Sequence, residues 1–162
     1  MIRYRKKLEH VKNIGAVIIN SPEYKEAAKQ PHHFRGNVAA HMINTAYYSY
    51  CICGFLNKLG IRTCTDELII SCLCHDLGIV GNRRNKYVTG PDCIKNHPID
   101  SIPIAERLMG SLTPRQENSI LMHMWPLAPS HPRYREGVIL SLVDKYCSVL
   151  ESSGLLKPTA VL

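Results

Sequence analysis

The sequence predicts an all-α protein, a single-domain bundle of about six or seven helices. Apolar residues recur at three- and four-residue spacing in several stretches, which is typical of helices with one buried face. Helix caps, prolines and glycines separate these stretches, and no segment shows the alternation typical of a strand. The 162 residues are enough for one domain with a core. We expect helices within residues 1–30 to pack on a main domain of residues 31–152, followed by a flexible tail, 153–162.

The first part of the chain predicts two short helices and a loop. The spacing of apolar residues favours an amphipathic helix over Ile2–Asn13. Ser21 can cap a second helix, because Pro22 suits the first helical position, and that helix runs to about Lys29. The following segment, PHHFRGN, is rich in turn-forming residues and carries Arg35, so we expect a loop.

A long helix is predicted next. Asn37 can cap a helix from Val38 to about Leu59, and Gly60 suits its end. His41 lies one turn inside this helix, close to its apolar stripe. Taken alone, such a histidine is more often a core residue that is hydrogen-bonded to a backbone carbonyl.

The most apolar segment is TDELIISCLCHDLGIVG, Thr65–Gly81. Thr65 can cap a buried helix, and Gly78 suits its C-terminal end. His75 and Asp76 are then the last polar side chains of a core helix, and both can reach one ion near its end. The simpler alternative is a hydrogen-bonded pair that closes the helix, because a buried polar pair without partners is costly.

A long loop is predicted over Ile79–Asn96, which is rich in glycine and asparagine. Loops of this length in compact domains are often functional. Arg83, Arg84 and Lys86 follow the His-Asp pair closely and could hold a phosphate group. A solvated basic loop without a ligand is the alternative.

Two short helices follow, and each is associated with one histidine. His97 precedes a helix over Pro98–Met109, and the capping box Thr113–Gln116 begins another helix that runs to about Met124. His123 falls in the last turn of that second helix. Helices joined by a short turn tend to pack antiparallel, so we expect the two histidines to lie close together. Alternatively, one only precedes a proline turn and the other only complements a helix dipole.

The last predicted helix runs from Arg135 or Glu136 to Glu151, after the proline-rich loop PLAPSHPRYRE. Asp144 lies beside its apolar stripe. An aspartate is uncommon there unless it is paired or coordinates a metal.

Taken together, these polar residues form an ordered set on separate helices: one histidine, a His-Asp pair, two single histidines and an aspartate. The set resembles the HD superfamily of metal-dependent phosphohydrolases over about Asn37 to Glu151. The resemblance implies an HD-type helical bundle and a metal site. Its ligands would be His41, His75, Asp76, His97, His123 and Asp144.

The resemblance also implies the chemistry of the site. A mixed nitrogen and oxygen set favours a divalent transition metal (Fe, Mn, Co, Ni or Zn) over calcium. One ion would need only His41, His75, Asp76 and Asp144, whereas the additional histidines provide for a second ion with Asp76 as the catalytic bridge. The expected reaction is hydrolysis of a phosphate ester or nucleotide by a metal-activated water.

Five cations are candidates for contacting the substrate: Arg35, Arg83, Arg84, Lys86 and Lys145. Two departures narrow the substrate class. No carboxylate follows the His-Asp pair closely, as it does in several one-metal nucleotidases of the superfamily. The Gly-Tyr-Pro stretch of its cyclic-dinucleotide phosphodiesterases is also missing, because His123 stands in HMWPLAP. The alternatives are an HD-type di-iron oxygenase and a non-catalytic metal- or nucleotide-binding module.

The composition limits which partners and which cellular compartment we expect. The net charge of +7 favours anionic partners such as phosphate esters or nucleotides, and it does not exclude nucleic acid. The sequence has no run of about 18 apolar residues that could span a membrane and no secretory signal, so we expect a cytoplasmic protein without membrane association. We expect the seven cysteines to be reduced and mostly buried. Nothing in the sequence indicates an oligomeric state.

Overall fold

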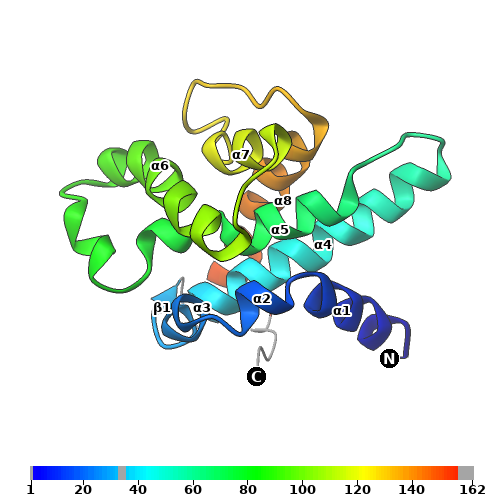
Figure 1. Cartoon of the computed structure of the whole chain (residues 1–162), viewed down its shortest axis with the longest axis horizontal. Coiled ribbons are helices and arrows are strands. Elements are labelled where there is room, and N and C mark those ends of the chain that lie inside the picture. Colours follow the sequence, from blue (N-terminus) through cyan, green and yellow to red (C-terminus); the bar gives the residue numbers. More distant parts are fainter. Residues whose placement is uncertain (1, 33–35, 157–162) are drawn as a thin grey trace.

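The computed structural model describes residues 2–32 and 36–156 and confirms the all-α prediction (Figure 1). Within these residues there are eight α-helices, two short 3₁₀ helices and one sheet of two two-residue strands. The α-helices are α1 (Ile2–Ile14), α2 (Ala16–Ile19), α3 (Pro22–Ala27), α4 (Val38–Lys58), α5 (Thr65–Cys74), α6 (Gly90–Met109), α7 (Pro114–Leu121) and α8 (Arg135–Ser152). The 3₁₀ helices are η1 (Leu77–Ile79) and η2 (Gly81–Lys86), and the strands are β1 (Pro31–His32) and β2 (Gly36–Asn37).

Helices α4 and α5 lie side by side and form the centre of the bundle (Figure 1). Helix α8 packs on α4, and α7 packs on both α5 and α8. Helix α1 contacts α4 and α5, while α6 packs mainly against η1. The core between these elements is largely aliphatic, and its fully buried side chains include Met42, Ile43, Ile69, Leu73 and Leu140.

Three predicted helix starts are confirmed by side-chain caps. Asn37 Oδ1 accepts a hydrogen bond from Ala40 N at 2.8 Å. Ser21 Oγ accepts one from Tyr24 N at 3.1 Å. The Thr113 hydroxyl and the Gln116 side chain form the expected capping box. Each cap satisfies a backbone N–H that has no partner within its helix.

The predicted helix through the His-Asp pair is shorter than expected. Helix α5 ends at Cys74, so His75 and Asp76 lie in the turn between α5 and η1. Thr65 is the first helical residue and not the cap. Gly78 is not at a helix C-terminus but in η1, where its backbone approaches α6 closely.

The prediction of a long loop over residues 79–96 is wrong over most of its length. Residues 81–86 form η2, and α6 begins at Gly90, eight residues before the predicted start at Pro98. Thr89 is the cap of α6, because its hydroxyl accepts a hydrogen bond from Asp92 N at 3.2 Å. Pro98 therefore lies inside the helix, where a proline is normally avoided.

Two smaller differences concern the segments around the other histidines. Helix α7 ends at Leu121, so His123 lies in the turn that follows it. The segment expected as a loop before α4 contains the strands β1 and β2, which pair antiparallel. Arg35 lies outside the described residues, as does most of the predicted tail, residues 157–162. The proposed division at residue 30 stays a prediction.

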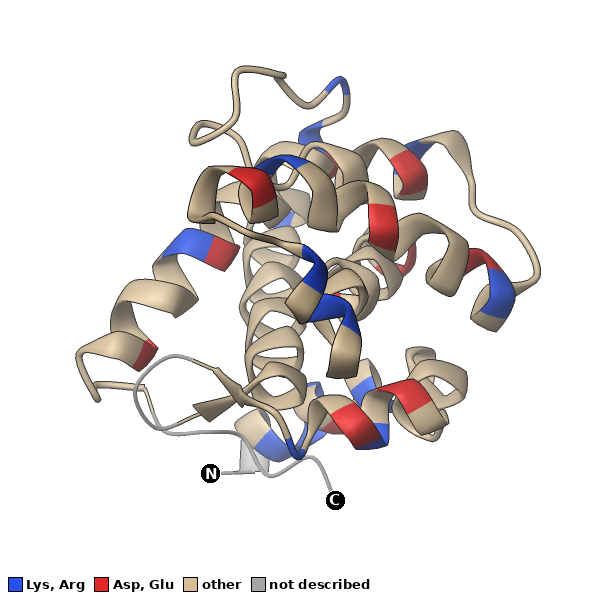
Figure 2. Cartoon of the chain, turned by 90° about the vertical axis from the view of Figure 1, so that its left-hand side faces the viewer, with Lys and Arg blue, Asp and Glu red and all other residues tan. Residues whose placement is uncertain are grey.

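Three further features concern the cysteines, the charged residues and the hydropathy of the helices. All seven cysteines are free thiols, and four of them are buried. Basic and acidic residues lie interspersed on the helices in Figure 2. No helix among the described residues is both long and apolar enough to cross a membrane.

Candidate metal centre

The predicted ligands come from distant parts of the sequence and meet in the interior. One lies in the first turn of α4, two lie in the turn after α5, one each lies in α6 and α8, and one lies in the turn after α7. All of them are buried: His41, His75, Asp76, His97, His123 and Asp144. A group of this kind requires compensation by hydrogen bonds or by a metal, because buried charge is costly.

Asp76 presents its two carboxylate oxygens to two different pairs of histidines. Its Oδ2 lies 3.5 Å from His75 Nε2 and 3.9 Å from His41 Nε2. Its Oδ1 lies 3.3 Å from His97 Nε2 and 3.7 Å from His123 Nε2. This arrangement suits a carboxylate that bridges two ions.

Asp144 completes the group on one side of Asp76. Its Oδ1 lies 2.9 Å from His41 Nε2 and 3.8 Å from His75 Nε2. Donors that are each about 2.1 Å from an ion lie about 3–4 Å apart, so these spacings suit one ion. We call the first group the Oδ2 side: His41, His75, Asp144 and Asp76 Oδ2. We call the second group the Oδ1 side: His97, His123 and Asp76 Oδ1.

Backbone carbonyls fix the orientation of three of the histidines. The Nδ1 atoms of His75, His97 and His123 each lie 2.7 Å from a carbonyl oxygen. The acceptors belong to Cys72, Cys93 and Ile120, respectively. A carbonyl can only accept, so Nδ1 carries the hydrogen and Nε2 of the neutral ring presents its lone pair to the centre.

His41 is oriented by a carboxylate that was not predicted from the sequence. Its Nδ1 lies 2.8 Å from Glu151 Oε2, and Asn44 Nδ2 donates to Glu151 Oε1 at 2.8 Å. A carboxylate behind a ligand histidine is a common device for holding its ring and raising its basicity. The available signal was spacing, because Glu151 lies seven residues after Asp144 and therefore on the same face of α8.

Two observations indicate that the centre fits a cation. His75 Nε2 is buried and has no hydrogen-bond partner among the described residues. His97 Nε2 and His123 Nε2 lie only 2.9 Å apart, although both rings use Nδ1 as the donor to a carbonyl. Two lone pairs at this distance repel, so either a metal ion or a proton on one of the two Nε2 atoms is required there. The buried histidines and aspartates can therefore hold a metal ion.

The carboxylates of the centre are strongly biased toward the ionised form. Burial alone would raise the pKa of Asp76, but the adjacent His75, His97 and His41 lower it well below its usual range. Burial would likewise raise the pKa of Asp144, but the hydrogen bond with His41, the adjacent His75 and the charge of Lys145 lower it. Ionised carboxylates are the form that binds a metal.

The histidines differ in their affinity for protons. Burial would lower the pKa of His41, but hydrogen bonds to Asp144 and Glu151 raise it to about 10. Burial also opposes protonation of His97, but Asp76 raises its pKa. The pKa of His123 is lowered well below its usual value by burial and by the neighbouring histidines. In the absence of metal, a proton on His41 therefore provides part of the positive charge that the carboxylates require.

A cavity of about 700 Å³ opens beside the centre. Asp76, His97 and Asp144 form its inner end, and the cations on its wall are Arg84 and Lys145. Most of the remaining wall is apolar: Ile79, Val88, Ile94, Met124, Leu127 and Val149. A pocket of this size can hold a small organic molecule with one end at the centre.

The ammonium group of Lys145 already has hydrogen-bond partners within the protein. Its Nζ donates to Asp144 Oδ2 at 2.8 Å and to the carbonyl of His123 at 2.6 Å. The lysine thereby holds the carboxylate so that Oδ1 faces the histidines, and it ties α8 to the turn that carries His123.

The other candidate cations are distributed over different surfaces. Arg84 lines the cavity, whereas Arg83 donates to the carbonyl of Val80 at 3.1 Å and lines a separate hollow beside α3. Lys86 lies 3.4 Å from Asp100 and lines a third hollow. Their contact with a substrate stays a prediction.

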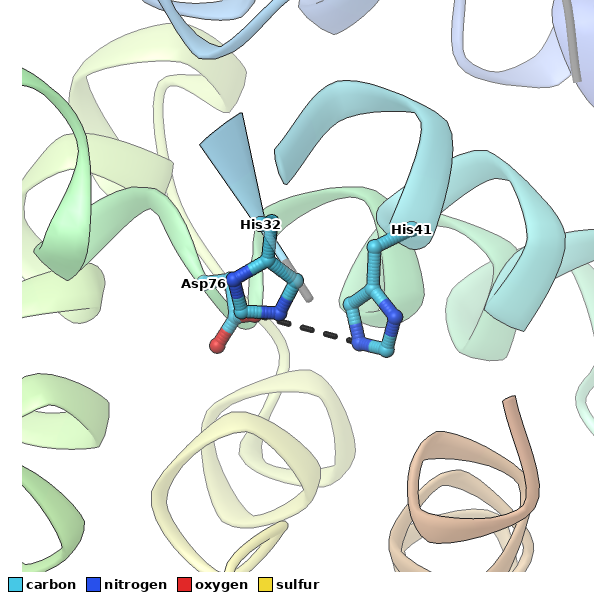
Figure 3. A group of neighbouring side chains, drawn as sticks. All are labelled: His32, His41 and Asp76. Atoms are coloured by element: carbon cyan, nitrogen blue, oxygen red, sulfur yellow. Dashed lines mark ion pairs between the residues drawn. The ribbon is translucent and has the colours of Figure 1, made fainter. Parts of the chain in front are cut away.

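One further histidine reaches the centre. His32 on β1 places Nε2 at 3.9 Å from Asp76 Oδ2, and its ring lies beside that of His41 (Figure 3). The sequence predicted only a loop at this position, because the approach of His32 depends on the β1–β2 hairpin and not on a local pattern.

No protein-family model, curated protein or solved structure matches the chain. The chemistry of the centre and of the adjoining cavity is therefore the basis for a function.

Proposed function

We propose that the chain is a metal-dependent phosphohydrolase that cleaves a phosphate ester or a nucleotide, as its resemblance to the HD superfamily implies. One observation carries the proposal: a buried aspartate presents its two oxygens to two sets of histidines at the inner end of a cavity. Enzymes that hydrolyse phosphate esters often use two ions that share such a carboxylate. A two-metal centre is therefore part of the proposal.

The donor set favours a first-row transition metal. Imidazole nitrogens outnumber carboxylate oxygens, which suits Fe, Mn, Co, Ni or Zn better than calcium or magnesium. When bound, such an ion would lower the pKa of a coordinated water to about 7 and so supply hydroxide at neutral pH.

The residues of the chain would position the substrate and exclude bulk water. Asp76 would fix the separation of the two sides of the centre, and Lys145 would hold Asp144 in place. Arg84 is the cation on the cavity wall with which a phosphate could pair. The apolar wall would contact the organic part of the ester, so we propose a small substrate whose phosphate is attached to a partly apolar group.

A di-iron oxygenase is the second candidate, because the nitrogen-rich donor set also suits iron and the apolar cavity suits a substrate without phosphate. Metal content and dioxygen uptake separate the two reactions. Hydrolysis releases phosphate with or without oxygen, whereas the oxygenase reaction requires dioxygen.

The test is metal analysis of the purified chain, followed by a phosphatase screen with the metal that is found. We expect Asp76→Ala to lose bound metal and phosphate release, because this residue belongs to both sides of the centre. Asp66→Ala is the matched control, since this aspartate lies exposed in the first turn of α5. Unchanged metal content in Asp76→Ala would contradict the assignment, and iron with oxygen uptake but no phosphate release would favour the oxygenase.

A further inference from the structure

His32 lies at the edge of the candidate metal centre, on the Oδ2 side. Its Nε2 is 3.9 Å from Asp76 Oδ2, and its ring centroid is 4.9 Å from that of His41. One donor atom from each of these three residues falls within 4.8 Å of the others. Figure 3 shows the two imidazoles next to each other with the aspartate beside them.

The backbone that carries His32 is tied to the backbone that follows Asp76. Gln30 immediately precedes the hairpin, and its Nε2 donates to the carbonyl of Ile79 at 2.8 Å. Its Oε1 accepts a hydrogen bond from Gly81 N at 2.6 Å. The carbonyl of Gln30 also accepts from Val38 N, at the start of α4. These bonds fix the hairpin relative to both α4 and the His-Asp turn.

His32 also belongs to the wall of the cavity, and its side chain is 14% exposed. The carboxylate oxygen that His32 approaches, Asp76 Oδ2, is the one that His41 and His75 also approach. The position matches that of a metal donor, because a first-row ion with six ligands takes donors about 3–4 Å apart.

We propose that His32 is a further metal ligand on the Oδ2 side of the centre. This inference rests on the metal-dependent function proposed above, because it concerns the same centre. The Oδ2 side then offers three histidine nitrogens and two carboxylate oxygens, whereas the Oδ1 side offers two nitrogens and one oxygen.

The two sides would then differ in the number of coordination positions that the protein leaves free. Five protein donors leave one position on a six-coordinate ion, and three protein donors leave three. The Oδ2 side would hold its ion more tightly, and the Oδ1 side would have more positions for substrate and water. His97, on the Oδ1 side, is also at the wall of the cavity, where a phosphate could approach.

The test uses the full chain stripped of metal and titrated with Co²⁺, with calorimetry for affinity and visible absorption for coordination. The absorption of Co²⁺ intensifies as its coordination number falls, so it reports the loss of a ligand directly. We expect His32→Ala to weaken the tighter binding step about 10–100-fold, the range typical for residues that support a metal site, and to intensify the absorption. His131→Ala is the control, because this exposed histidine contacts the ring of Trp125 and is not part of the centre.

Thermal unfolding of the metal-free variants checks the fold. If His32→Ala does not fold, His32→Gln replaces it, because glutamine retains a polar side chain but lacks the imidazole nitrogen. Wild-type affinity and absorption in the folded variant would overturn the inference while leaving the metal centre intact. A wild-type chain that bound no Co²⁺ would instead refute the proposed function itself.

Discussion

Gly78→Ala tests the contact that connects the His-Asp turn to α6. An added Cβ at Gly78 would lie 2.3 Å from the carbonyl oxygen of His97, whereas ordinary contacts begin at 3.4 Å. Helix α6 would have to move away from η1 by about 1 Å, which is an overpacking change that typically costs about 1–3 kcal/mol. For a domain of this size we expect the unfolding temperature to fall by about 2–12 °C.

The same displacement would reach the Oδ1 side of the centre. Gly78 N donates to Ser101 Oγ at 2.8 Å, and that hydroxyl lies 2.7 Å from the carbonyl of His75 and 2.9 Å from that of His97. One serine thus links the backbones of two of the candidate ligands, His75 and His97. A shift of about 1 Å near a catalytic centre can reduce the rate about 100-fold, so we expect Gly78→Ala to lose most metal-dependent activity.

The assays are thermal unfolding by circular dichroism and calorimetric titration with a divalent metal. Gly54→Ala is the matched control, because a Cβ at this position in α4 would meet nothing within 4 Å. Helix propensity alone predicts that this control gains up to about 1 kcal/mol. If Gly78→Ala unfolds at the wild-type temperature and binds metal normally, the close approach of η1 and α6 does not position the centre.

Two further predictions concern the second ion and an ion pair on the surface. A His97→Ala, His123→Ala double variant should keep about one ion per chain by metal analysis and lose most phosphate release, because both ligands belong to the Oδ1 side. Full activity would exclude a catalytic role for that side, and loss of both ions would contradict the division of ligands. Burial would raise the pKa of Glu23, but hydrogen bonds from its own backbone amide and from Arg107, 2.6 Å away, lower it. Its stabilisation is therefore present above the unfolded pKa of about 4.3 and lost as the pH falls through the folded value, so Glu23→Gln should lower the unfolding temperature at pH 7 and lower it by less at about pH 3. An equal difference at both pH values would contradict this.

Helix starts were predictable because capping is local. The side chain of Asn37 bonds a backbone N–H only three residues later, and the capping box at Thr113 has the same range. The cap at Thr89 is equally local and is followed by Pro91 in the first turn, but the predicted start of α6 was at Pro98 and therefore too late. A proline favours a helix start without requiring one.

The end of α5 was not predictable from local sequence. The residues after Asp76 are apolar and are compatible with a continued helix. In the structure, however, the hydroxyl of Ser101 on α6 bonds Gly78 N and the carbonyl of His75, which would otherwise serve a helix. A contact between residues 23 positions apart therefore determines where the helix ends.

In the candidate site, too, some features follow from local sequence and others depend on long-range contacts. Its main residues were identified because their order along separate helices forms a recognisable set. Glu151 and His32 were missed because each reaches the centre only through packing, one by the pairing of α8 with α4 and the other by the hairpin. The approach of His32 depends on tertiary structure that no local spacing expresses, whereas the seven-residue spacing from Asp144 indicates the helix face of Glu151 but not its contact with His41.

The sequence separation within the Oδ2 side bears on when an ion can be acquired during biosynthesis. His41 and Asp144 are neighbours in the fold but lie 103 residues apart in the chain. At a translation rate of about 5–20 residues per second, α8 emerges about 5–20 s after α4. A nascent chain therefore exposes His41 and His75 well before Asp144 is available to complete the Oδ2 side. If that side holds an ion, as we propose, its full set of ligands would form only once α8 has packed on α4.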